Sequence, residues 1–137
     1  PASASLLSGS RDEYFAYYNR SNLTEEWLLK NPKWEWDGKR VEYKSSLIIE
    51  NIQYLFYESY DRQRDVRNLL VRTLDTLASL SAPMLVETMD SRRRSQGEFA
   101  IKLSEDRSKI AIFTNPPFKV RGSENFYVRI YDKNLEE

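Results

Sequence analysis

The apolar residues near the start of the chain recur with a helical period. Tyr14, Tyr17 and Tyr18 lie at positions i, i+3 and i+4 behind two acidic residues, which predicts a short aromatic-faced helix. A second helix is predicted to begin at Asn22, because a polar cap residue is followed three positions later by an acid. It should end before Pro32, since the residue preceding a proline disfavours the helical conformation.

The next segment, residues 33–43, predicts a β-hairpin. Its centre is Asp37-Gly38, the preferred sequence for a two-residue type I′ turn between alternating runs. Folding the chain there pairs Trp36 with Lys39, Glu35 with Arg40, Trp34 with Val41 and Lys33 with Glu42. We expect the face that carries Trp34 and Trp36 to cover the core, and a platform for a ligand or partner is the alternative interpretation.

The longest apolar pattern predicts a central helix from about residue 46 to residue 81. Its helical positions are Ile48, Ile49, Ile52, Leu55, Phe56, Val66, Leu69, Leu70, Leu74, Leu77 and Leu80. An unbroken helix of this length would extend ~54 Å, so we expect it to break within the polar stretch 60–65 or to project from the domain. Tyr54, Tyr57 and Tyr60 form a second aromatic stripe at i, i+3 and i+6.

Towards the C-terminus the apolar period changes to two. The alternating positions are Phe99, Ile101 and Leu103, then Ile110 and Ile112, then Phe126, Val128 and Ile130. They predict three antiparallel strands, whereas 84–89 fits either a helix or a strand and 90–97 reads as a loop. We therefore predict an α+β fold in which residues 1–10 are a flexible N-terminal segment, 11–132 form a single domain and 133–137 form a tail.

The residue types present narrow the chemistry. The 137-residue chain contains no cysteine and no histidine, which excludes thiolate nucleophiles, disulfides and the commonest general base and metal ligand. Lys plus Arg and Asp plus Glu both total 21, so no overall charge favours nucleic acid or anionic lipid. We expect no cofactor, no metal and no catalytic residue. Without an apolar stretch of about 20 residues, we also expect an intracellular protein, cytoplasmic or nuclear, that does not enter a membrane.

Aromatic and arginine side chains favour a non-enzymatic function. The chain has nine Tyr and three Trp, and these types, with Arg, are enriched in the energetic centres of protein interfaces. We therefore expect a protein-interaction or assembly module, such as an adaptor, a regulator or an inhibitor subunit, that binds a protein partner or a second copy of itself. The interface candidates are Tyr54, Tyr57, Tyr60, Arg64, Trp34 and Trp36.

The alternative hypothesis is a nucleic-acid-binding module centred on a basic loop. Arg92, Arg93 and Arg94 are consecutive, and Lys119 and Arg121 would add positive charge if the sheet brings them near. Neutralisation of phosphates supplies most of the affinity in such complexes.

A third hypothesis comes from Asn115-Pro116-Pro117-Phe118, which follows a predicted strand. This tetrad resembles the Asn-Pro-Pro-aromatic motif of the amino-group methyltransferases. The resemblance implies that Asn115 would hold the target amine and that Phe118 would stack on the base. The alternative interpretation is that the two prolines end the strand and stiffen the connection to the next one.

Overall fold

The computed structural model describes residues 2–7, 14–91, 97–117 and 125–137, and this part of the chain consists of strands without a helix. The predicted α+β fold is therefore wrong. The strands are β1 (Ala2–Leu7), β2 (Tyr14–Asn19), β3 (Glu25–Lys30), β4 (Glu35–Trp36), β5 (Lys39–Ile49), β6 (Ile52–Asp61), β7 (Val66–Leu74), β8 (Met84–Asp90), β9 (Glu98–Leu103), β10 (Ile110–Asn115) and β11 (Tyr127–Tyr131). β1 falls within the N-terminal segment 1–10.

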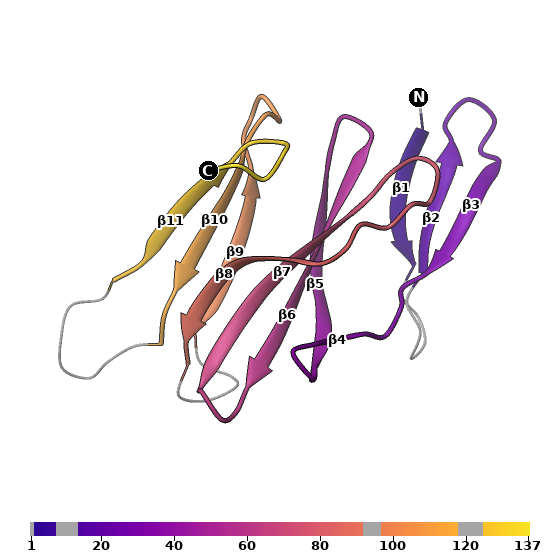
Figure 1. Ribbon diagram of the computed structural model, residues 1–137. Helices are drawn as coiled ribbons and strands as arrows, with labels where there is room; N and C mark the ends of the chain where they lie inside the picture. The colour runs from indigo at the N-terminus through magenta and orange to yellow at the C-terminus, as the bar shows by residue number, and fades with distance from the viewer. Residues whose placement is uncertain (1, 8–13, 92–96, 118–124) are drawn as a thin grey trace.

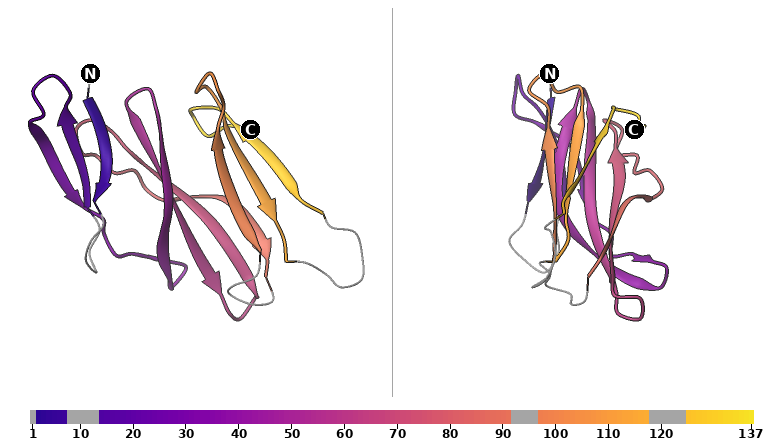
Figure 2. Two further views of the ribbon diagram at one scale, coloured as in Figure 1. Left: turned by 180° about the vertical axis from the view of Figure 1, so that it is seen from behind. Right: turned by 90° about the vertical axis from the view of Figure 1, so that its left-hand side faces the viewer.

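The strands form three antiparallel sheets in the order of the chain. β1–β3 form the first sheet, β4–β8 the central sheet and β9–β11 the third, and within each sheet every strand pairs with its neighbour in sequence. Figure 1 shows the three sheets one after another across the molecule, and the view from behind in Figure 2 shows the same succession in reverse. We call β1–β3 the N-terminal layer and β9–β11 the C-terminal layer.

The central sheet is covered on both faces. One of its faces packs against the N-terminal layer through Leu55, Tyr57 and Leu70, which share a core cluster with Phe15. Its other face packs against the C-terminal layer in a cluster formed by Ile49, Tyr54, Phe56, Leu69, Val71, Val86, Met89, Phe99, Ile110, Ile112 and Tyr131. Successive side chains of a strand point to opposite faces, so consecutive residues of β6 and β7 enter different clusters.

This double burial explains why the predicted central helix is wrong. The segment 46–81 covers the end of β5, all of β6 and β7 and the start of the connection to β8, and in β6 the five consecutive residues 53–57 are all buried. A strand buried on both faces loses the alternation of apolar and polar residues by which strands are recognised. In addition, a register shift between Tyr43 and Ser45 changes the phase of the alternation within β5.

The two predicted N-terminal helices are wrong for a different reason. Their aromatic residues lie on β2 and β3, where Tyr17 pairs with Trp27 and the two rings stack with their centroids 5.4 Å apart. Asn22, expected to cap a helix, instead stabilises the β2–β3 turn by accepting hydrogen bonds from the backbone N–H and the hydroxyl of Thr24, at 3.1 and 2.6 Å. The same short polar side chain serves either role.

The predicted Trp hairpin and C-terminal sheet are confirmed. Glu35 pairs with Arg40 and Trp36 pairs with Lys39. Asp37 and Gly38 have φ angles of 49° and 69°, as a type I′ turn requires. β9, β10 and β11 form the expected antiparallel sheet. The ambiguous segment 84–89 is strand β8.

Candidate functional site

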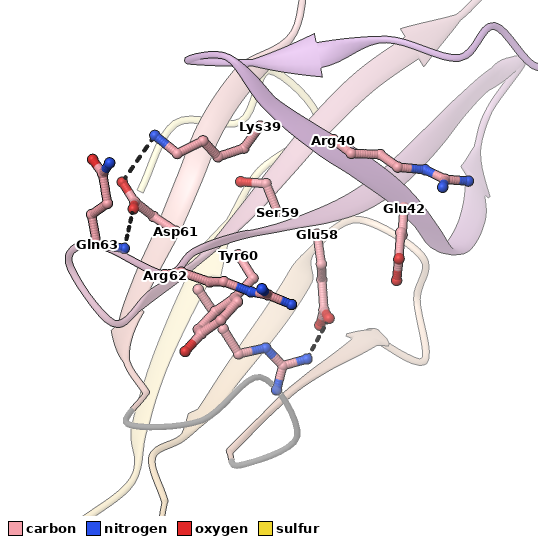
Figure 3. Close-up of a pocket in the computed structure, with 10 residues that line it drawn as sticks. Lys39, Arg40, Glu42, Glu58, Ser59, Tyr60, Asp61, Arg62 and Gln63 are labelled. Carbon is pink, nitrogen blue, oxygen red and sulfur yellow. Dashed lines mark hydrogen bonds and ion pairs between the residues drawn. The ribbon is translucent and has the colours of Figure 1, made fainter.

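A polar cleft opens at the end of the β5–β6 and β6–β7 pairs, with a volume of about 550 Å³ (Figure 3). Strands β5, β6 and β7 and the β6–β7 turn supply its walls. The lining residues are Lys39, Arg40, Glu42, Glu58, Ser59, Tyr60, Asp61, Arg62, Gln63 and Arg67. Four of the charged side chains are basic and three are acidic, which favours ion pairs within the wall.

Glu58 is the centre of one set of contacts in this cleft. Its carboxylate lies 3.2 Å from the Lys44 ammonium and 2.5 Å from the Arg67 guanidinium. Arg67 also donates a hydrogen bond to the carbonyl of Gly97, the residue that precedes β9. Arg67 thus connects the central sheet to the C-terminal layer, and its charge is already compensated within the protein.

Asp61 is the centre of a second set of contacts. It lies 3.4 Å from the Lys39 ammonium and accepts hydrogen bonds from the backbone N–H groups of Gln63 and Arg64, at 2.9 and 3.3 Å. Burial raises the pKa of Asp61, but the N–H donors and Lys39 outweigh that effect and hold the pKa below its usual value. Asp61 therefore stays ionised at neutral pH and closes the β6–β7 turn.

Tyr60 is held in the cleft wall in its neutral form. Its hydroxyl donates a hydrogen bond to Oδ1 of Asp65 at 2.9 Å. Desolvation raises the pKa of Tyr60, and the hydrogen bond and charge of Asp65 raise it further. The phenol is consequently a hydrogen-bonding group at neutral pH.

Two arginines are the free charges of the cleft. The side chains of Arg40 and Arg62 are exposed, and neither has a hydrogen-bond or ion-pair partner in the described part of the chain. Figure 3 shows both guanidinium groups extending away from the Asp61 contacts. They can meet an anionic group of a partner, with the small energies typical of exposed ion pairs.

A second candidate surface lies on the C-terminal layer. Strand β11 is at the edge of its sheet, because it pairs with β10 and with no other described strand. Around it, Phe126 is 69% exposed, Tyr127 58%, Val128 42% and Ile130 54%. Phe113 of β10 is opposite Val128 in the register and half-buried, so it extends the apolar surface onto the sheet's outer face.

The register of the C-terminal layer shows which side of β11 faces solvent. Ile110 and Ile112, both fully buried, pair with Tyr131 and Arg129, so these two β11 residues point towards the central sheet. Val128 and Ile130 therefore point outwards. We call Phe113, Phe126, Val128 and Ile130 the outer patch.

The structure separates the interface candidates proposed from the aromatic stripe. Tyr54 and Tyr57 are buried on opposite faces of β6, and Tyr60 is half-buried in the cleft. The predicted stripe depended on a helical period. Because β6 is a strand, its three tyrosines do not lie on one face. Arg64 is exposed in the β6–β7 turn, with a guanidinium nitrogen 3.9 Å from Asp37.

Trp34 and Trp36 are half-buried and pack against the core cluster beneath the N-terminal layer. This position agrees with the first interpretation of the hairpin, in which its tryptophan face covers the core.

Other candidates lie outside the described residues. Arg92, Arg93, Arg94, Lys119, Arg121 and Phe118 are among them, so the nucleic-acid hypothesis stays a prediction. Asn115 is the exposed last residue of β10 and is followed by the two prolines, as the strand-ending interpretation expects. The methyltransferase resemblance also stays a prediction.

Among the described residues, no group of three or more acidic side chains is placed to hold a metal ion. None of these residues forms a helix with the length and apolar character needed to cross a membrane.

No protein-family model, curated protein or solved structure matches this chain. The function must therefore be inferred from the molecule's own surfaces. Sequence analysis missed the outer patch, although one signal was present: residues 126–131 are apolar or aromatic on both alternating sets of positions, with Arg129 as the exception. A last strand of this kind buries one set and exposes the other.

Proposed function

We propose that this protein is a non-enzymatic protein-binding module, an adaptor, regulator or inhibitor subunit, and that it binds through β11 and the outer patch. The observation that carries the proposal is the exposure of large apolar side chains along an edge strand and directly before it: Phe126 at 69%, Tyr127 at 58% and Ile130 at 54%. Single exposed apolar residues are common, but a contiguous group on one edge favours an interaction surface.

In the described part of the chain, β11 carries little of the protection that edge strands normally have. Edge strands are usually blunted by charged side chains, prolines, bulges or a covering segment, because their free N–H and C=O groups pair readily with another chain. Strand β11 has a continuous register with β10 and contains one charged residue, Arg129. The Arg129 guanidinium lies 3.4 Å from the Glu87 carboxylate, so its charge is directed towards β8.

This geometry suits addition of a strand from a partner. In that mode of recognition, backbone hydrogen bonds supply affinity, and pockets for alternate side chains supply specificity. A strand paired to β11 would place every second side chain beside Val128 and Ile130 on the outer patch. The backbone of β11 would thus supply affinity for the partner strand, and the outer patch would supply specificity for its side chains.

The proposal can be tested with a charge-bearing variant of the patch. A Val128→Lys/Ile130→Lys double variant keeps the β-strand backbone but places two ammonium groups on the binding face. We expect wild-type protein immobilised on beads to retain a partner from lysate of its native cells, and the double variant to lose at least ten-fold of it. Circular dichroism and thermal unfolding of both proteins verify that the fold is unchanged.

Leu77→Lys provides the matched control. Leu77 is 85% exposed but lies in the connection after β7, away from the patch. It should retain the partner at the wild-type level. Equal retention by wild type and the double variant would refute the proposed function.

A further inference from the structure

We propose that β11 pairs antiparallel with β11 of a second copy of the chain, around a two-fold axis that passes beside Val128. This inference rests on the proposed function and names the partner strand. The paired strands would join the two C-terminal layers into one continuous sheet of six strands.

The order of residues on β11 is self-complementary about Val128. An axis perpendicular to the sheet places residues that are equally far before and after its centre opposite each other and on the same face. Val128 then faces its own copy, and Phe126, directly before β11, faces Ile130 of the second copy when the pairing extends by one residue. The outer patches of both chains meet, so apolar side chains become buried against apolar side chains.

The inner face of the paired strands is also complementary. Tyr127 would lie opposite Arg129 of the second copy, an arrangement in which a guanidinium group meets an aromatic ring. Arg129 already has acidic neighbours in its own chain, at 3.4 Å from Glu87 and 4.0 Å from Glu137. The edge therefore presents no uncompensated charge that would repel an identical edge.

Other centres for the same axis are less favourable. A centre at Arg129 places two guanidinium groups directly opposite each other, which is destabilising. With the centre at Tyr127, Val128 pairs with Phe126 of the second copy, but Ile130 is moved beyond Asn125 and loses its apolar contact. A centre between two residues joins the outer face of one chain to the inner face of the other, because a shift of one residue turns each side chain to the opposite face. Val128 is the centre that pairs apolar with apolar at every position of the outer face from 126 to 130.

The absence of cysteine from the chain allows this register to be measured directly. In a Val128→Cys variant, the two thiols of a dimer would be on directly opposed residues, whose Cα atoms are about 4.5–5.5 Å apart in antiparallel sheets. Disulfides form across about 4.4–6.8 Å, so mild oxidation should convert most of this variant to a covalent dimer.

Ile130→Cys is the matched control, because it adds one exposed thiol on the same face of the same strand. In the proposed register, the two Ile130 positions are four residues apart along the paired strands, or about 13 Å, which is beyond disulfide reach. Ile130→Cys alone should stay uncrosslinked. An equimolar mixture with Phe126→Cys should form the mixed disulfide, since these positions are opposite each other.

Sedimentation velocity on the unmodified protein completes the test. We expect a dimer whose dissociation constant rises at least ten-fold in the Val128→Lys/Ile130→Lys variant. A monomer at all accessible concentrations would overturn the inference. A dimer that survives the double variant would also overturn it, as would a dimer in which Val128→Cys does not crosslink.

These failures are distinguishable from failure of the proposed function. A chain that stays monomeric and still loses a lysate protein on Val128→Lys/Ile130→Lys substitution binds a different partner through the same edge. In that case the proposed function stands and the second copy is excluded.

Discussion

The two faces of the central sheet are packed with different kinds of side chain. Towards the N-terminal layer, rings meet edge to face: Tyr57 contacts Trp34 and Tyr43, with centroids 5.0 and 5.8 Å apart and interplanar angles of 77° and 79°. Towards the C-terminal layer, eleven of the sixteen residues in the cluster and packed against it are aliphatic, whereas six of the twelve on the other face are aromatic. The same strands β6 and β7 serve both faces.

Hydrogen bonds accompany the ring contacts on the face that packs against the N-terminal layer. On the aromatic face, the Tyr57 hydroxyl donates to Oδ1 of Asn31 at 2.9 Å, and the Trp27 indole N–H donates to the carbonyl of Thr76 at 2.8 Å. Edge-to-face rings and hydrogen bonds have preferred directions, whereas aliphatic contacts depend on shape and volume. The aromatic face thus adds directional ring contacts. Hydrogen bonds also cross to the C-terminal layer, from the Tyr131 hydroxyl to the Val86 carbonyl at 3.1 Å and from Arg67 to the Gly97 carbonyl.

The largest expected effect tests whether both faces are core. Leu69 and Leu70 are consecutive on β7, are both 0% exposed, and enter the C-terminal and N-terminal clusters respectively. Leu69→Ala and Leu70→Ala should each lower the free energy of unfolding by about 2–5 kcal/mol. Urea denaturation measures both, with the exposed Leu77→Ala as control. A change near zero at either leucine would show that its face is not covered.

A smaller effect on stability is expected from substitution of two glycines, one in the Trp hairpin and one directly before β9. Gly97 has a φ of 81°, and a Cβ atom there would lie 2.8 Å from the Met89 sulfur and 3.1 Å from the Asn115 carbonyl oxygen. Gly38, in the Trp hairpin, has a φ of 69° but open space around it. Gly38→Ala should cost about 1–2 kcal/mol from backbone strain alone, and Gly97→Ala should cost more. Thermal unfolding of both variants decides, and equal losses would show that Met89 moves aside freely.

The third effect isolates a polar anchor of the aromatic face. Tyr57→Phe keeps the ring contacts but removes the hydroxyl that donates to Asn31, and it should cost about 1 kcal/mol. Tyr17→Phe is the control, because the Tyr17 ring stacks on Trp27 and its hydroxyl has no partner in the described residues. Chemical denaturation of the pair checks this. Loss of the same size in both would remove the argument for a directional anchor.

The smallest expected effect is a difference in acid sensitivity between a turn of the C-terminal layer and a turn of the N-terminal layer. The β9–β10 turn is held by Asp106, whose carboxylate accepts hydrogen bonds from the Ser104 and Ser108 hydroxyls at 2.7 and 2.8 Å. The Ser104 hydroxyl and the groups of Ser108 lower the pKa of Asp106 to about 2. The β2–β3 turn instead uses the amides of Asn19 and Asn22, which do not titrate.

Because the pKa of Asp106 is lower in the folded state than the ordinary value of about 3.9, its contribution to stability is present above pH 4. That contribution should disappear as the pH falls from about 4 to about 2. An Asp106→Asn variant should lack this part of the pH dependence. Urea midpoints measured across the range test it, and identical slopes for both proteins would contradict it.

The parts of the fold that could be predicted were those with a strong local signal. The Asp37-Gly38 turn requires two positive φ angles, and the C-terminal strands expose one set of alternating residues or end at clear turns. The central strands have no such signal. Leu55, Phe56 and Tyr57 are buried on both sides of β6, so their pattern resembles a buried helix until the tertiary structure is known.

The candidate site was less predictable than the fold. The cleft depends on Glu58 and Arg67 meeting across β6 and β7, and their proximity follows from strand register rather than spacing in sequence. The outer patch depends on which set of β11 residues faces the central sheet. Both facts arise from pairing between strands. The helical interpretation of residues 46–81 excluded the first, and it left no central sheet against which the two faces of β11 could be assigned.

The strictly sequential pairing of strands has a consequence for how the chain folds. Each pair in the three sheets joins neighbours in sequence, so forming a hairpin closes only a short loop and costs little chain entropy. Long-range contacts are needed only when the finished sheets stack. We therefore expect rapid hairpin formation within each sheet, followed by a slower collective step in which the outer sheets dock on β5–β8.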